Sequence, residues 1–301
     1  MLTAGTLRRT DTLFAMRAPW LFRTAWLILP FTLGPILATA LDDTSTPGRR
    51  VVSVALWSVW ATTLVGALVP RTVTLTLVRI VGPATLAAAI WATAAAGFDA
   101  AAAMGLIGAS IVTVLVSDPA LAEHFVNGSS YGPEIRLPLR TPAAVILGPL
   151  PLAWSAVVIG ASAGPMLLAY QRWLPGIVLS VIGVPLAGMA ARSLHGLSRR
   201  WLILVPGGVV VHDPLALREP VLMPSPTVMD MRPAPAEFGP RLDLTGRAPG
   251  LAVQIDLDPA VGFGLIGRDR RTDVTEATAV LVTPDRANRA LSLGREKLRL
   301  R

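Results

Sequence analysis

Cysteine is missing from all 301 residues of the chain. Its absence excludes disulfides, thiol nucleophiles, iron–sulfur clusters and cysteine-ligated zinc. Charge is also scarce, since only 15% of the residues are charged, against about 25% in a typical soluble domain. The deficit lies in residues 1–192, which hold long uncharged runs, whereas residues 193–301 have the composition of an ordinary soluble protein. The sequence therefore predicts an apolar first part followed by a separate C-terminal domain.

The motifs of common enzyme and metal sites are lacking as well. The three histidines, His124, His195 and His212, lie far apart and form no H-x-x-H or H-E-x-x-H spacing, so a zinc site is not expected. The sequence has no G-x-S-x-G elbow, no phosphate-binding lysine loop and no G-x-G-x-x-G that opens a helix. We therefore predict no catalytic residue, no metal and no cofactor.

Basic residues outnumber acidic ones, which gives a net charge of +8, and Lys297 is the only lysine among them. A basic chain can bind nucleic acid, but many of these arginines flank apolar runs, where the positive-inside bias of membrane proteins accounts for them. We therefore expect the lipid bilayer and not nucleic acid as a partner. The abundance of Arg, Ala, Gly, Pro and Val is typical of a GC-rich bacterial genome, which indicates a bacterial inner (cell) membrane.

The apolar runs predict an α-helical multi-pass membrane protein with about six transmembrane helices. A helix that crosses the ~30 Å hydrocarbon core needs about 20 mostly apolar residues. Residues 80–116 are too long for one span, and Gly97-Phe98-Asp99 supplies a turn between two spans. A cytoplasmic tail, residues 1–23, precedes the transmembrane domain, residues 24–192, whose spans are expected at about 24–41, 51–69, 75–97, 100–116, 143–170 and 174–192.

The fifth apolar run contains Pro149, Pro151 and Pro165 and is longer than one straight span requires. It is either one kinked span or a partly re-entrant segment, because lipid tolerates a helix break only where neighbouring helices satisfy the freed backbone groups. Six spans place both termini on the same side. That side holds eight of the arginines in the tail and loops, and the other side holds three, so both termini are predicted to be cytoplasmic.

The C-terminal domain, residues 193–301, shows the pattern of short strands. Residues 201–205 and 209–212 are branched and apolar, and Pro206-Gly207-Gly208 between them is a strong hairpin signal. Further strands are expected at about 220–223, 227–231, 251–256 and 278–282, followed by a helix at 286–299. The pattern predicts antiparallel strands closed by one terminal helix, as a small β barrel or sandwich.

This order of elements resembles the bacterial pleckstrin-homology-like (PH-like) domains that follow membrane helices. The residues that carry the resemblance are RRWLILVPGGVVVHDPLALREPVLMP at 199–224 and TAVLVTPDRANRAL at 278–291. The resemblance covers roughly the last hundred residues and implies a PH-like fold that binds a protein partner or lipid head groups.

The leading hypothesis is a non-enzymatic scaffold or accessory subunit whose cytoplasmic domain contacts a membrane or cytoplasmic protein partner or lipid head groups. A cation near an anionic leaflet contributes about 1 kcal/mol. The candidate contact residues are arginines that follow the last span or lie in the β-rich domain: Arg199, Arg200, Arg268, Arg270 and Arg271.

Two alternatives belong to other functional classes. A small transporter or transporter subunit would carry ionisable groups near mid-membrane, and the central parts of the predicted spans hold none. A membrane glycosyltransferase-like enzyme would use the pair Asp256 and Asp258, since D-x-D pairs hold a metal and a sugar diphosphate. On an alternating strand both carboxylates can instead face water while Leu257 faces the core, which is the favoured interpretation.

Overall fold

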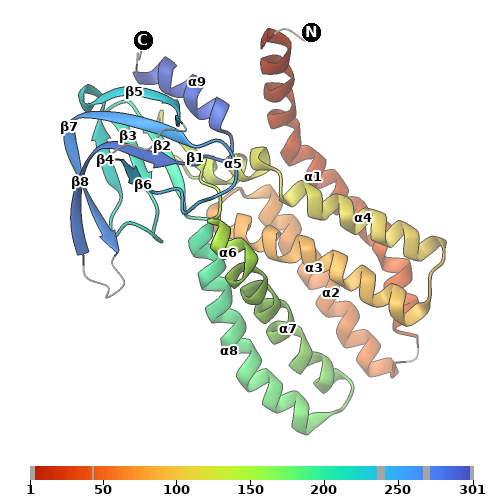
Figure 1. Ribbon diagram of the computed structural model, residues 1–301. Coiled ribbons are helices and arrows are strands. Elements are labelled where there is room, and N and C mark those ends of the chain that lie inside the picture. Colours follow the sequence, from red (N-terminus) through yellow and green to blue (C-terminus); the bar gives the residue numbers. More distant parts are fainter. Residues whose placement is uncertain (1–3, 43, 236–240, 267–271, 299–301) are drawn as a thin grey trace. The chain divides into compact units, whose positions relative to one another are not determined.

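The computed structural model describes residues 4–42, 44–235, 241–266 and 272–298. The chain divides into two compact units. Residues 1–128 and 152–192 form a helical unit, and residues 129–151 and 193–301 form a β-rich unit. Figure 1 shows the two kinds of architecture along the chain, with helices in the first part and arrows concentrated near the C-terminus.

Long helices make up the helical unit. They are α1 (Ala4–Ala40), α2 (Thr46–Leu68), α3 (Thr72–Ala96), α4 (Ala100–Val116), the short α5 (Pro119–Asn127), α7 (Pro149–Ala169) and α8 (Trp173–Leu197). Within the described residues, the part of α1 from Arg17 onward and helices α2, α3, α7 and α8 are each long and apolar enough to cross a membrane. The chain is thus compatible with a multi-pass membrane protein.

A sixth span depends on a bent pair. Helix α4 has 17 residues, about 25 Å at ~1.5 Å per residue, which is short of the ~30 Å hydrocarbon core. Helices α4 and α5 together satisfy the length and composition of a span, but they meet at a bend of 58°. Among the residues that the structure describes, there are therefore five apolar helices of spanning length, or six if this pair is one broken span.

Two carboxylates define the starts of helices α4 and α5. Asp99 accepts a hydrogen bond from the backbone N–H of Ala102 at 2.7 Å and begins α4 after the turn at Gly97, whose φ is +94°. Asp118 accepts from the N–H of Ala120 at 2.6 Å and begins α5, with Pro119 in the first turn. Both satisfy backbone donors that a helix start otherwise leaves unpaired. The turn predicted at Gly97-Phe98-Asp99 is therefore confirmed.

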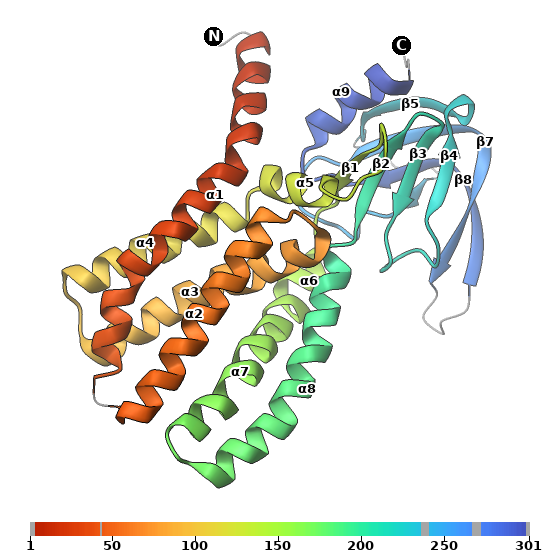
Figure 2. The same ribbon diagram turned by 180° about the vertical axis from the view of Figure 1, so that it is seen from behind.

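Helices α7 and α8 form a hairpin (Figure 2), and two glycines allow them to approach closely. A Cβ atom on Gly160 would lie 2.5 Å from the carbonyl oxygen of Gly183, and one on Gly183 would lie 2.8 Å from the carbonyl oxygen of Gly160. Small residues of this kind allow two spanning helices to approach along their backbones. The described faces of α8 away from this crossing expose large apolar side chains such as Ile177, Val181 and Met189.

The β-rich unit contains two four-stranded sheets. The first has the order β1-β2-β3-β4, with β1 (Ile135–Pro138), β2 (Trp201–Val205), β3 (Gly208–His212) and β4 (Val221–Pro224), all antiparallel. The second has the order β5-β7-β8-β6, with β5 (Val228–Pro233), β6 (Leu242–Asp243), β7 (Val253–Ile266) and β8 (Thr272–Val282).

The hairpin predicted at Pro206-Gly207-Gly208 is present as β2–β3. The short β6 pairs parallel with β8, so the expectation of purely antiparallel strands is wrong at this point.

Strand β1 comes from the segment 117–142, in which the sequence predicts a loop. Ile135 pairs with Leu204 and Pro138 with Trp201, so β1 lies beside β2 although α6 (Ala143–Leu147), α7 and α8 intervene in the sequence. The α7–α8 hairpin is therefore an insertion between two neighbouring strands of one sheet. Its two chain ends, 139–148 and 198–200, are held together by that sheet.

The terminal helix α9 (Ala287–Leu298) contributes to the core of the β-rich unit. Ala290, Leu291 and Leu298 are buried together with residues of both sheets. Gly294 allows close packing on Met231, because a Cβ there would lie 2.7 Å from the methionine sulfur. The C-terminal region is thus small, rich in sheet and completed by a final helix.

Candidate functional site

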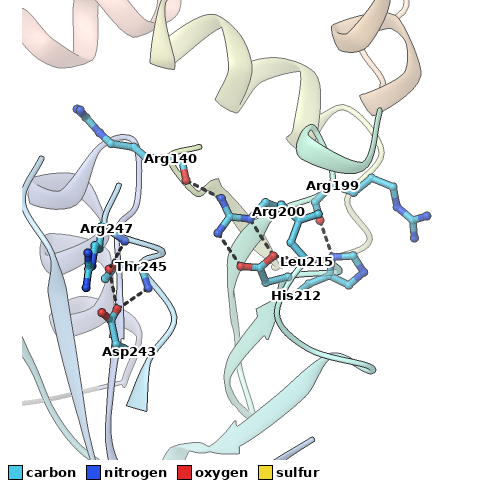
Figure 3. Close-up of polar contacts among 9 residues, drawn as sticks. Arg140, Arg199, Arg200, His212, Leu215, Asp243, Thr245 and Arg247 are labelled. Atoms are coloured by element: carbon cyan, nitrogen blue, oxygen red, sulfur yellow. Dashed lines mark hydrogen bonds and ion pairs between the residues drawn. The ribbon is translucent and has the colours of Figure 1, made fainter. Parts of the chain in front are cut away.

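A buried ion pair lies at the base of the α7–α8 hairpin. Arg200 stands between the end of α8 and the start of β2, and Asp213 directly follows β3. Arg200 Nε donates to one carboxylate oxygen of Asp213 at 2.8 Å, and Nη2 donates to the other at 2.6 Å (Figure 3). The side chains are only 2% and 0% exposed. This bidentate geometry fixes the guanidinium and carboxylate planes relative to each other and is the strong form of an arginine–carboxylate contact.

The same arginine joins the two ends of the hairpin. Its Nη1 donates to the carbonyl oxygen of Arg140 at 2.6 Å, and its own carbonyl oxygen accepts from the N–H of Leu139 at 3.0 Å. Residues 139 and 140 precede α7, whereas Arg200 follows α8. We call Arg140, Arg200 and Asp213 the hairpin clamp. All three guanidinium nitrogens of Arg200 donate hydrogen bonds in it, so the arrangement fixes the positions of the three residues.

Arg140 extends the hairpin clamp to the turn before β7. Its Nη1 donates to the carbonyl oxygen of Pro249 at 3.0 Å. Its Nε lies 4.0 Å from the carboxylate of Asp285. Gly250 adopts a φ of +118°, and a Cβ at this position would lie 2.9 Å from the guanidinium carbon of Arg140. Glycine is therefore required here both for its backbone conformation and for the room it leaves.

His212 lies beside the hairpin clamp. Its ring stacks on Trp201 with centroids 5.1 Å apart, and Nδ1 lies 2.6 Å from the carbonyl oxygen of Arg199, which requires Nδ1 to carry the proton. Burial lowers the pKa of His212 below its ordinary value, and the charge of Arg199 acts in the same direction. The imidazole serves here as a packed hydrogen-bond donor to the Arg199 carbonyl oxygen.

Comparison of the chain with known protein families, with curated proteins and with solved structures gives no match.

The arginines predicted as contact residues lie in different environments in the structure. Arg199 is exposed two residues after the end of α8, as a head-group contact requires. Arg200 is 3% exposed and fully engaged by Asp213 and Arg140, so it is removed from the expected contact surface. Arg268, Arg270 and Arg271 lie outside the described residues.

The D-x-D pair occupies strand β7. Leu257 is buried, whereas Asp258 is exposed and Asp256 is half-buried. Asp256 accepts from Arg232 Nε at 2.9 Å and from Gln254 Nε2 at 2.6 Å, and this contact raises the pKa of Arg232. Across the part of the chain that the structure describes, no group of three or more His, Asp or Glu side chains is placed to hold a metal.

Strand β8 presents an open edge. Its inner edge pairs with β7 over residues 272–282, whereas its outer edge pairs with β6 only at Val280 and Leu281. Over residues 274–279 no described strand covers the outer edge. Val274 is 72% exposed, and Thr275, Glu276 and Thr278 are exposed as well. An uncovered edge of this length is a template for pairing with another extended segment.

The sequence predicted the β2–β3 hairpin but not the hairpin clamp. Asp213-Pro214 has the signature of a turn, and the N–H of Leu215 does donate to Asp213 at 3.1 Å. The second role of Asp213, as partner of Arg200, depends on the β2–β3 register, in which Trp201 faces His212. Once that hairpin is recognised, Arg200 and Asp213 are the two residues that flank its open end, and this position is the signal that could have paired them.

Proposed function

We propose that the chain is a membrane-anchored, non-enzymatic scaffold whose β-rich unit recruits a protein partner. The open edge of β8 carries this proposal. A partner segment in extended conformation would add as a further strand along residues 274–279, with main-chain hydrogen bonds giving affinity and exposed side chains giving specificity. Val274 and Thr278 alternate with the buried Ala277 and Ala279. The strand at this edge therefore has one solvent-exposed face and one apolar, buried face.

The membrane location belongs to the same proposal. The spanning helices anchor the chain in a bacterial inner membrane with both termini in the cytoplasm, and the β-rich unit adopts a PH-like fold. The hairpin clamp supports this arrangement, because it ties that unit to both ends of the α7–α8 hairpin. Arg199 follows α8 closely enough to attract anionic head groups, which would hold the unit at the membrane surface.

Site-specific photo-crosslinking in intact membranes tests the recruiting surface. A photoreactive amino acid replaces Val274 on β8 in one variant and Leu222 on β4 in the other. Leu222 is the matched control, because it is also apolar, 50% exposed and in the same unit. We expect a crosslink to a second, different polypeptide from position 274 and none from position 222.

A charge at the edge supplies the second arm of the test. Val274→Lys places a solvated cation where a strand would add, a common means by which proteins protect edges, and should abolish the crosslink from a neighbouring position such as Thr278. Leu222→Lys should leave it intact. A crosslink from position 274 to lipid alone, or to another copy of this chain, contradicts the proposal.

A further inference from the structure

The exposed face of β8 lies beside glycines of the neighbouring strand β7. Gly262 pairs with Glu276, and Gly264 pairs with Val274. Side chains that face each other across antiparallel strands normally pack together, and a glycine offers none. A Cβ on Gly262 would lie 3.4 Å from Cγ1 of Val274, so the valine packs on the glycine backbone. On their β7 side, Glu276 and Val274 therefore have main chain beside them instead of side chains.

Glu276 carries a charge that is not compensated within the described structure. The residue is exposed, and no described residue forms an ion pair or a hydrogen bond with its carboxylate. The next charged residue along β8, Asp273, has the same sign. The strand runs about 14 Å from its start at Thr272 to Glu276 at ~3.4 Å per residue, which exceeds the Debye length of ~8 Å in physiological salt. Charges carried by residues before the strand therefore act on this carboxylate only weakly.

Three side chains follow one another on the exposed face of the open edge. Val274, Glu276 and Thr278 are each exposed, and they lie at alternate positions, about 7 Å apart at ~3.4 Å per residue. In an added strand, the residues opposite them would share one face and the same spacing. The edge therefore presents an apolar, an acidic and a β-branched polar position in a fixed order.

The charge also bears on whether the added strand could come from a second copy of this chain. An antiparallel pair of β8 strands centred on Glu276 would place the two copies of this carboxylate opposite each other. Like charges directly opposite destabilise a strand pair, whereas opposite charges stabilise it. Charge complementarity therefore favours a different polypeptide, with a cation at this position, over a second copy.

We propose that the partner recruited at the β8 edge offers an extended basic segment, with lysine or arginine opposite Glu276 and an apolar side chain opposite Val274. This inference rests on the proposed function, since it names the chemistry of the strand that adds along residues 274–279. Main-chain hydrogen bonds give affinity for any extended segment, whereas the carboxylate selects among segments. An acidic segment is rejected, because it would place like charges face to face.

Two synthetic heptapeptides serve as probes, Thr-Val-Thr-Lys-Thr-Val-Thr and its counterpart with glutamate at the centre. Each reads the same in both directions, so its central residue can face Glu276 whichever way the added strand runs. A photoreactive amino acid replaces Thr278 in the full detergent-solubilised chain, and intact-mass spectrometry measures how much of each peptide is trapped on illumination. We expect about fivefold more of the lysine peptide than of the glutamate peptide.

Charge variants in the same photoreactive background identify the residue that selects. Glu276→Lys should reverse the preference, and Glu276→Gln should remove it. Glu296→Lys is the matched control, because Glu296 is also an exposed carboxylate of the β-rich unit but lies on α9. This control should keep the fivefold preference for the lysine peptide.

The failures of the inference and of the proposed function look different. Equal trapping of both peptides beside an intact Glu276, or a lysine preference that survives Glu276→Lys, overturns the inference and leaves recruitment at this edge standing. If neither peptide is trapped above the yield from a photoreactive residue at Leu222, the edge adds no strand, and the proposed function fails together with the inference.

Discussion

Arg200 and Asp213 face each other across the open end of the β2–β3 hairpin and are joined by two hydrogen bonds of 2.8 and 2.6 Å with almost no solvent contact. Because the pair is buried, removing one partner leaves the other charged and unpaired. That cost exceeds the net value of the pair itself. The relationship makes the hairpin clamp a sensitive point for the stability of the β-rich unit.

Asp213→Asn should destabilise the β-rich unit by about 3–5 kcal/mol, because it leaves the Arg200 guanidinium buried without its counter-charge. Hydrogen exchange of the β2 and β3 amides in the detergent-solubilised chain measures the change. The double change Arg200→Met, Asp213→Leu should recover most of the protection, since both charges are then gone. Arg232→Gln is the control. It breaks the more exposed pair with Asp256 and should have little effect. Unchanged exchange in Asp213→Asn would show that the pair does not hold the sheet.

The unit should lose stability in mild acid through His212. Its folded-state pKa lies below the ordinary value because of burial, so the unfolded chain binds the proton more readily. The contribution of neutral His212 to the stability of the β-rich unit is therefore complete above about pH 6.5. It declines as the pH falls from there toward the lowered pKa of the folded state. Thermal unfolding measured across this window should show the decline, and His212→Gln should flatten it. A pH profile identical in wild type and variant would contradict this assignment.

Gly160→Ala should weaken the α7–α8 hairpin, because the added Cβ would lie 2.5 Å from the carbonyl oxygen of Gly183. Overpacking of this kind costs about 1–3 kcal/mol. The temperature at which the solubilised protein aggregates reports the loss. Gly188→Ala, on the open side of α8, should match the wild type. If both variants behave alike, the glycine crossing does not limit stability.

The proposed sidedness can be tested because the chain has no native cysteine. Phe98, in the turn between α3 and α4, is 75% exposed, and Tyr131, after α5, is 86% exposed. In intact cells a membrane-impermeant maleimide should label Phe98→Cys and spare Tyr131→Cys, and lysis should make both reactive. The reverse pattern would place the β-rich unit outside the cell.

Local signals in the sequence predicted the local structure well. Apolar runs located the long helices, Gly97-Phe98-Asp99 located the turn before α4, and Pro206-Gly207-Gly208 located a hairpin, because each depends on residues close together in the chain. Strand β1 was missed because it has only four residues, ends at Pro138 and pairs with a strand that follows three intervening helices in the sequence. The parallel pairing of β6 with β8 was missed for the same reason.

The candidate site was harder to predict than the fold. Arg199 and Arg200 are adjacent and chemically identical in the sequence, yet one is exposed and the other is buried against Asp213. What separates them is the direction in which each side chain leaves the backbone at the start of β2. The charge pattern near a predicted span therefore shows where basic residues are concentrated. It does not show which of them is buried in an ion pair and which is exposed.

The insertion of α7 and α8 between β1 and β2 has a consequence for biosynthesis. Strand β1 is translated before the roughly sixty residues that separate it from β2. Synthesis of those residues takes several seconds at ~5–20 residues per second. Until both helices and then β2 have been synthesised, β1 lacks the strand with which it pairs in the folded protein. Closure of the first sheet therefore follows only after the whole hairpin is made, and a chain stalled there would expose an unpaired strand to proteases and chaperones.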